Sequence, residues 1–229
     1  MHGYQPKGVA GGIALTTLTI SSRNYSSWSL RGWLLCKISG VDFKVKTVSV
    51  DDPSARAELL LLSPSCLVPC LEHNGAKIWD TLAIAEYLDE TFPDAGMLPK
   101  DRIKRARCRS VSGEMHSGFY NLRSALPMNL KAHYTNFKTW AGAKPDIARV
   151  KTIWQECLQD GGPYLFGKQL TMADAMYAPV CTRFLTYDVP LDPVSAAYCD
   201  TIMKWPALKE WIELAKTEPD EMAELDAEF

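Results

Sequence analysis

The pattern of apolar and polar residues at the start of the chain predicts a strand followed by a helix. Residues 13–20 are rich in β-branched side chains and predict a strand. After a polar loop, Leu30, Leu34 and Ile38 recur at helical spacing. Gly40 then stands where a left-handed C-cap would end the helix. The chain therefore opens as a strand and an amphipathic helix.

The next forty residues continue this alternation of strand and helix. Residues 43–46 alternate with period two and predict a half-buried strand, and Ser54 can cap a short helix that runs to Leu62. Residues 67–71 and 77–79 predict a strand pair, because the Asn-Gly dipeptide between them is a strong hairpin signal. A helix over residues 82–92 completes the order β-α-β-α-β-β-α. This order predicts a thioredoxin-like α/β domain with a mixed four-stranded sheet.

The rest of the chain has helical patterns and no further strand pattern. We predict a flexible tail over residues 1–12, the α/β domain over 13–93, a linker over 94–99 and an all-helical domain over 100–229. The helices expected in the second domain cover residues 103–125, 145–158, 171–187 and 207–215.

Composition and charge narrow the possible classes of function. The chain has 229 residues, of which 47% are hydrophobic and 23% charged, as in folded globular proteins. Its 25 Lys and Arg against 27 Asp and Glu leave a net charge of -2, which argues against a nucleic-acid partner. The four-leucine run at 59–62 is far shorter than the ~20 apolar residues of a membrane span, so no membrane partner is expected.

The cysteines indicate a reducing compartment rather than a disulfide framework or a metal site. There are seven, an odd number at scattered positions. Cys66, Cys70 and His73 lie close together, but no second cluster completes four ligands, so we expect no metal. The first dozen residues lack the apolar centre of a secretory signal. We therefore expect a cytoplasmic protein with buried free thiols.

Residues 25–31 are the first candidate for chemistry, because they lie between the first strand and the first helix. The N-terminus of a helix favours an anion, and a serine hydroxyl there can donate to a thiolate or carboxylate. Serines also cap helices without any further role, and three of them occur here, at Ser26, Ser27 and Ser29. From these residues alone, both interpretations stay open.

Two dipeptides further along the chain are also candidates. Pro69 inside a predicted strand indicates an edge, a bulge or a cis turn, and a cis bond would leave the backbone of Val68 free for a peptide-like ligand. Asp80 and Thr81 begin a helix, where both are good caps. Together they could also bind the ammonium and carboxylate of an α-amino acid.

In this order and on this framework, the segments resemble the cytosolic glutathione transferase superfamily over nearly the whole chain. Residues 63–71 look like the motif before the family's cis-proline. Residues 79–88 look like its acidic-hydroxyl pair with the following helix, and Thr171 to Asp174 resembles the capping box of its helical domain. The segment 26–31 is most similar to the zeta-like, serine-type bacterial members. Trp28 stands where zeta members often have cysteine, which counts against zeta-type isomerisation.

The resemblance implies a role for each matching residue. Ser26 falls at the position of the activating hydroxyl, with Ser27 as the alternative if the register slips by one. The hydroxyl would stabilise the glutathione thiolate by donating a hydrogen bond, not act as a base. The residues expected to bind glutathione are Trp28, Val68, Pro69, Asp80 and Thr81. The expected wall of the second-substrate site is His116, Phe119, Tyr120 and Arg123.

The implied function is that of a glutathione transferase, which joins the sulfur of glutathione, its co-substrate, to a small hydrophobic electrophile. The alternatives are another glutathione-dependent reaction (isomerisation, peroxide reduction or dehalogenation) and a non-catalytic glutathione-binding protein. Leu67 stands where the family often has a lysine for the glycyl carboxylate, a departure that favours the last alternative. The resemblance also implies a homodimer.

Overall fold

The N-terminal half of the computed structural model is built on a four-stranded mixed sheet, as predicted. The structure describes residues 16–48 and 67–219. The strands are β1 (Thr17–Ile20), β2 (Lys44–Thr47), β3 (Cys70–His73) and β4 (Ala76–Trp79). They lie in the order β2-β1-β3-β4, with β1 parallel to β2 and antiparallel to β3, and with β3 antiparallel to β4. The predicted residues 13–15 and the predicted helix from Ser54 to Leu62 lie outside the described residues.

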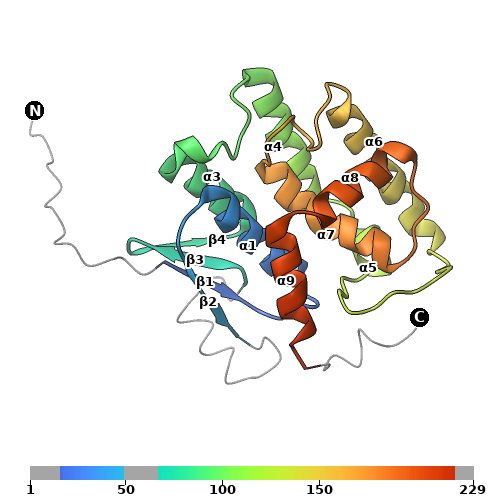
Figure 1. The fold of residues 1–229 in the computed structure, drawn as a ribbon, viewed down its shortest axis with the longest axis horizontal. Helices are drawn as coiled ribbons and strands as arrows, with labels where there is room; N and C mark the ends of the chain where they lie inside the picture. Colours follow the sequence, from blue (N-terminus) through green and yellow to red (C-terminus); the bar gives the residue numbers. More distant parts are fainter. Residues whose placement is uncertain (1–15, 49–66, 220–229) are drawn as a thin grey trace, which may run out of the picture.

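Two helices of this domain pack against each other beside the sheet (Figure 1). α1 (Ser27–Ser39) connects β1 to β2 and ends at Gly40, which has a φ of 72° and forms the predicted left-handed C-cap. α3 (Thr81–Thr91) follows β4 directly. The apolar faces of both helices join the main hydrophobic core through residues such as Leu34 and Leu88.

The third strand starts later than the sequence pattern predicts, at Cys70 instead of at residue 67. The reason is the Val68–Pro69 peptide bond, which is cis. Proline has no N–H for the ladder, and the cis bond turns the chain, so regular pairing begins only beyond it. The hairpin turn is as predicted: Asn74 and Gly75 have φ values of 50° and 83°, the positive pair that a tight hairpin needs.

The C-terminal half is helical, with two departures from the prediction. Its helices are α4 (Arg102–Ser117), α5 (Tyr120–Ala125), α6 (Lys144–Leu158), α7 (Met172–Thr186), α8 (Pro193–Met203) and α9 (Pro206–Lys216), with short 3-10 turns at Pro93–Ala95 and Ala141–Ala143. The single helix predicted over 103–125 is wrong, because Gly118 is extended and Phe119 adopts a φ of 57°. α8 was not predicted, although Asp192 caps it and Pro193 occupies its first turn.

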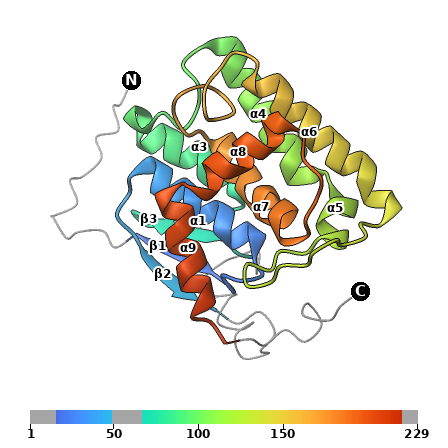
Figure 2. The same cartoon turned by 45° about the vertical axis from the view of Figure 1, so that its right-hand side comes forward.

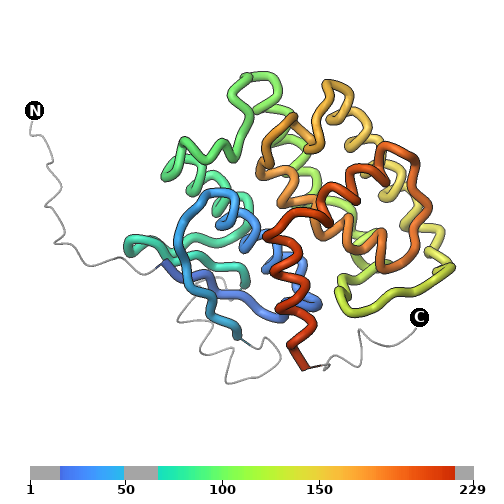
Figure 3. Tube along the Cα trace, in the orientation of Figure 1, coloured from blue at the N-terminus to red at the C-terminus, as the bar shows by residue number. Residues whose placement is uncertain are grey.

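α7 lies at the centre of the helical half, and nearly all of its residues are buried. Thr171 and Asp174 form the predicted capping box at its start. Figures 2 and 3 show how α9, at the red end of the chain, returns to lie beside α1, which α7 also contacts. The two halves therefore share one continuous core around α1 and α7.

The described cysteines, six in number, are buried, as expected for thiols that serve as small apolar side chains. In the part of the chain that the structure describes, no helix has both the length and the apolar character needed to cross a membrane.

Candidate active site

The cis-proline brings three segments of the α/β domain together. Pro69 directly precedes β3, and Cys70 at the start of that strand pairs with Trp79 at the end of β4. Asp80 and Thr81 therefore lie next to the Val68–Pro69 bond. On the other side Pro69 touches α1, where a Cβ added to Gly32 would lie 2.6 Å from its ring. The Val68–Pro69 bond thus lies between the start of α3 and the middle of α1.

The N-terminus of α3 has acceptor and donor groups side by side. Asp80 is the N-cap, and its Oδ1 accepts hydrogen bonds from the N–H groups of Leu82 (2.9 Å) and Ala83 (3.2 Å). Thr81 is only 1% exposed, and its hydroxyl has no hydrogen-bond partner among the residues that the structure describes. A buried hydroxyl without a partner is costly, so a ligand oxygen is an expected partner. The sequence pattern indicated capping, and the structure adds this vacant donor.

Ser26 caps α1 with a half-buried side chain. Its Oγ accepts from the backbone N–H of Ser29 at 3.3 Å and donates to the Oγ of Ser29 at 2.9 Å. The Oγ of Ser29 also accepts from the backbone N–H of Ser21, at 3.1 Å. Ser29 therefore keeps a partner if the hydroxyl of Ser26 turns toward a ligand, which leaves Ser26 able to donate to an anion.

Ser27, the alternative, faces the helical half instead. It is 6% exposed, and its Oγ accepts a hydrogen bond from Nη2 of Arg183 on α7, at 3.0 Å. The other terminal nitrogen of Arg183 donates to the carbonyls of Arg123 and Leu126. Arg183 thereby ties the start of α1 to the end of α5, and Ser27 is part of this junction between the two halves.

Trp28 is surrounded by arginines that lack acidic partners. The guanidinium carbons of Arg31 and Arg123 lie 4.5 and 4.9 Å from the centroid of its ring. Arg31 is fully buried, donates to the carbonyls of Met176 and Ser27, and leaves Nη2 without a partner among the described residues. Within residues 16–48 and 67–219, no carboxylate forms an ion pair with Arg31, Arg123 or Arg183.

Burial and the repulsion between neighbouring guanidinium groups lower the pKa values of Arg31 and Arg183. Burial, together with the charges of Arg183 and Arg123, lowers the pKa of Arg31 well below its ordinary value. Burial and the charge of Arg123 lower the pKa of Arg183 to about 10. An uncompensated positive potential therefore surrounds the first turn of α1, in addition to the helix dipole, and it favours an anion at this place.

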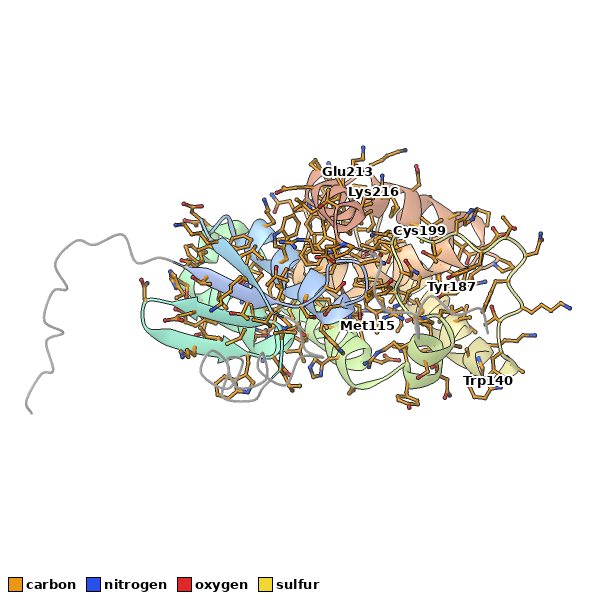
Figure 4. All side chains as sticks on the ribbon, turned by 90° about the horizontal axis from the view of Figure 1, so that it is seen from below. Met115, Trp140, Tyr187, Cys199, Glu213 and Lys216 are labelled. Carbon is orange, nitrogen blue, oxygen red and sulfur yellow. The ribbon has the colours of Figure 1, made fainter. Side chains whose placement is uncertain are left out.

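The four residues expected to form the wall of the second-substrate site do not line one surface in the structure. His116 and Arg123 both contact the ring of Trp28, with a centroid distance of 5.3 Å for His116. His116 also bonds to Oδ2 of Asp80 at 2.7 Å, so it faces the α/β domain. Phe119 is buried in the core, whereas Tyr120 is 74% exposed. Figure 4 shows Met115, the neighbour of His116 on α4, in the interior between the two halves.

Sequence reasoning missed the two buried arginines and a contact with the C-terminal segment. Arg183 is the one basic residue of α7, among mostly apolar neighbours, and this is a signal that could have identified it. Glu218 accepts hydrogen bonds from Ser22, Arg23 and Asn24, in the loop that leads to Ser26. No local pattern connects residues so far apart in the sequence.

Family comparisons match both halves of the chain. The family model of the glutathione S-transferase N-terminal domain matches residues 25–91, and that of the C-terminal domain matches residues 140–214. A glutathione transferase homolog from Burkholderia, solved with bound glutathione, aligns with a TM-score of 0.69 and 24% identity over 89% of this chain and 100% of its own. A similarity of this level shows the common fold.

Curated relatives agree with this assignment. A probable maleylacetoacetate isomerase of Caenorhabditis elegans is 33% identical over 75% of this chain and 79% of its own length. Maleylacetoacetate isomerase of Rattus norvegicus is 30% identical over the same shares, and glutathione S-transferase L3 of Arabidopsis thaliana is 29% identical over 84% and 77%. With a four-stranded mixed sheet, a cis-proline between α1 and the start of α3, and a helical second half, the chain belongs to the cytosolic glutathione transferase superfamily.

Proposed function

We propose that this protein binds glutathione where α1, cis-Pro69 and α3 meet, and ionises its thiol for attack on a hydrophobic electrophile. The observation that carries the proposal is the buried hydroxyl of Thr81, which has no hydrogen-bond partner among the described residues, beside the carboxylate of Asp80. These groups suit the carboxylate and the ammonium of the γ-glutamyl end. The backbone of Val68, at the cis bond, suits the central peptide unit, which leaves the sulfur to lie toward Ser26.

The thiol is activated by groups that stabilise its anion. The hydroxyl of Ser26 turns from Ser29 to donate to the sulfur, while the positive end of α1 and the uncompensated arginines lower the energy of the thiolate. The thiolate then attacks carbon, a C–S bond forms, and the leaving group departs with its electron pair. Each unit by which the thiol pKa falls corresponds to ~1.4 kcal/mol of stabilisation of the thiolate.

The test is to replace Ser26 and to follow the ultraviolet absorbance of the bound thiolate against pH. In the wild type the bound thiol should ionise well below free glutathione. Ser26→Ala should raise its apparent pKa by about one unit and reduce turnover about tenfold or more. Ser26→Thr keeps a hydroxyl and an N-cap and should retain most activity. Ser27→Ala is the matched control one residue away.

Two results would contradict the proposal at different points. A wild-type complex whose thiol ionises like free glutathione would remove the activation step altogether. If Ser26→Ala keeps full turnover and Ser27→Ala does not, the activating hydroxyl is that of Ser27, and the junction with Arg183 belongs to the catalytic machinery.

A second candidate function is cis–trans isomerisation of an unsaturated acid, in which the thiolate adds to a double bond and leaves again after rotation. The cluster of Arg31, Arg123 and Arg183 favours it, because a carboxylate substrate would supply the missing negative charge. Two relatives named as maleylacetoacetate isomerases also favour isomerisation. Parallel turnover assays with an activated aryl halide and with maleylacetoacetate separate the two reactions.

The homodimer stays a prediction from the family resemblance, and the cytoplasmic location stays a prediction from the cysteines and the first dozen residues. Size-exclusion chromatography with light scattering tests the first, and fractionation of the native cells tests the second.

A further inference from the structure

His116 on α4 contacts the N-terminus of α3. Its Nε2 lies 2.7 Å from Oδ2 of Asp80, and its ring packs on Trp28. The side chain of His116 is 30% exposed and that of Asp80 is 46% exposed, so both are accessible to a ligand. This contact joins α4 to the place where the ammonium of glutathione is expected to bind.

Asp80 does not need His116 to fix its orientation. Its Oδ1 already accepts from the N–H groups of Leu82 and Ala83, as an N-cap does. The remaining oxygen, Oδ2, is the atom left for an ammonium group, and it is the one that His116 contacts. A carboxylate oxygen has two lone pairs, so a histidine and an ammonium can share it.

The charge of His116 decides how strongly this shared oxygen attracts a cation. A neutral imidazole donates one N–H and leaves the carboxylate with its full negative charge. An imidazolium neutralises the carboxylate and also repels the ammonium. Histidine is the side chain type whose charge ordinarily changes between pH 5 and 8.

Other charged and titratable groups near His116 come from α1, α3, α4, α5 and α7. Arg31 on α1 and Arg123 on α5 flank the same tryptophan ring. Glu86 on α3 and Glu114 on α4 are each paired with an arginine, and the hydrogen bond from Arg109 lowers the pKa of Glu86. On α7, burial raises the pKa of Tyr177, which donates its hydroxyl proton to the carbonyl of Val111, and raises that of Asp174, which lies at the far capping box.

We propose that His116 is a positioning residue of the glutathione site: it shares Oδ2 of Asp80 with the ligand's ammonium, and its protonation weakens glutathione binding. This inference rests on the proposed function and changes the expected role of His116, from the wall of the second-substrate site to the glutathione half. The affinity for an ammonium-bearing tripeptide should therefore fall as the pH falls.

The test uses S-methylglutathione, whose sulfur cannot ionise, in calorimetric titrations between pH 5.5 and 7.0. In this interval the carboxylates of the probe stay ionised and its ammonium stays protonated. For the wild type we expect the affinity to be about threefold weaker at pH 5.5 than at pH 7.0. His116→Gln keeps a donor without the charge and should bind equally at both pH values. His116→Lys keeps a charge throughout and should bind weakly at both.

Two controls separate this effect from general pH sensitivity. N-acetyl-S-methylglutathione lacks the ammonium, so its binding to the wild type should not weaken at low pH. His133→Gln replaces an exposed histidine in the loop after α5 and should keep the wild-type pH dependence. The inference is overturned if His116→Gln follows the wild-type pH profile. Absence of S-methylglutathione binding at any pH would instead refute the glutathione site itself.

Discussion

Glu218 fixes the loop that leads to the candidate active site, and its removal should weaken the fold measurably. The carboxylate of Glu218 accepts hydrogen bonds from the backbone N–H groups of Arg23 (2.7 Å) and Asn24 (3.2 Å), from the Ser22 hydroxyl (3.0 Å) and from Nη1 of Arg23 (3.1 Å). These three residues begin two positions after β1 and precede the N-cap Ser26 by a few positions. We predict that Glu218→Ala destabilises the protein.

The magnitude follows from the burial of this contact. The side chains of Arg23 and Glu218 are 19% and 18% exposed, so solvent screens the charges less than at an open surface. A hydrogen bond to a charged group contributes ~1.5–3 kcal/mol, but water can reach the donors once the carboxylate is gone, so we expect a total loss of about 2–3 kcal/mol. For a chain of this size that loss lowers Tm by about 5–10 °C.

Thermal and urea unfolding of the variant and of Glu213→Ala measure this difference. Glu213 lies on the outer side of α9 and pairs with Lys216, as the labels in Figure 4 show. Its side chain is 70% exposed, so its removal should change the free energy of unfolding by less than about 0.5 kcal/mol. Equal stability of the two variants would refute the assignment of Glu218 as an anchor of the loop.

Two further predictions concern packing and capping. Gly32→Ala places a methyl group 2.6 Å from the ring of Pro69, so it should destabilise the protein by ~1–3 kcal/mol and weaken glutathione binding. Gly113→Ala has open space around it in α4 and should stabilise the protein by up to ~1 kcal/mol. Urea unfolding compares the two variants. Asp174→Ala removes the acceptor for Leu165, Thr171 and Tyr198, all buried, and should cost ~3–5 kcal/mol; a loss below 1 kcal/mol would contradict this role.

The local elements could be predicted wherever a short-range signal determines them. The left-handed cap at Gly40, the Asn74-Gly75 turn and the capping box at Thr171 each depend on residues within a few positions of one another, and all three are confirmed. The failures have a different origin. The helix breaks at Phe119, where a phenylalanine adopts a positive φ. Burial of its ring in the core offsets the backbone strain. The neighbouring residues do not specify this burial, so the local sequence could not predict the break.

In the candidate site, too, some features depend on neighbouring residues and others depend on tertiary packing. The sequence alone determined which residues begin the two helices and where the proline lies, because helix caps and proline geometry are properties of neighbouring residues. Only the tertiary structure decided which hydroxyl faces which half, that His116 meets Asp80, and that Arg183 reaches Ser27 from α7. These contacts join residues 36 to 156 positions apart, and the packing of α4 and α7 on the α/β domain determines them. Such packing depends on the shape of the whole core, which no local segment specifies.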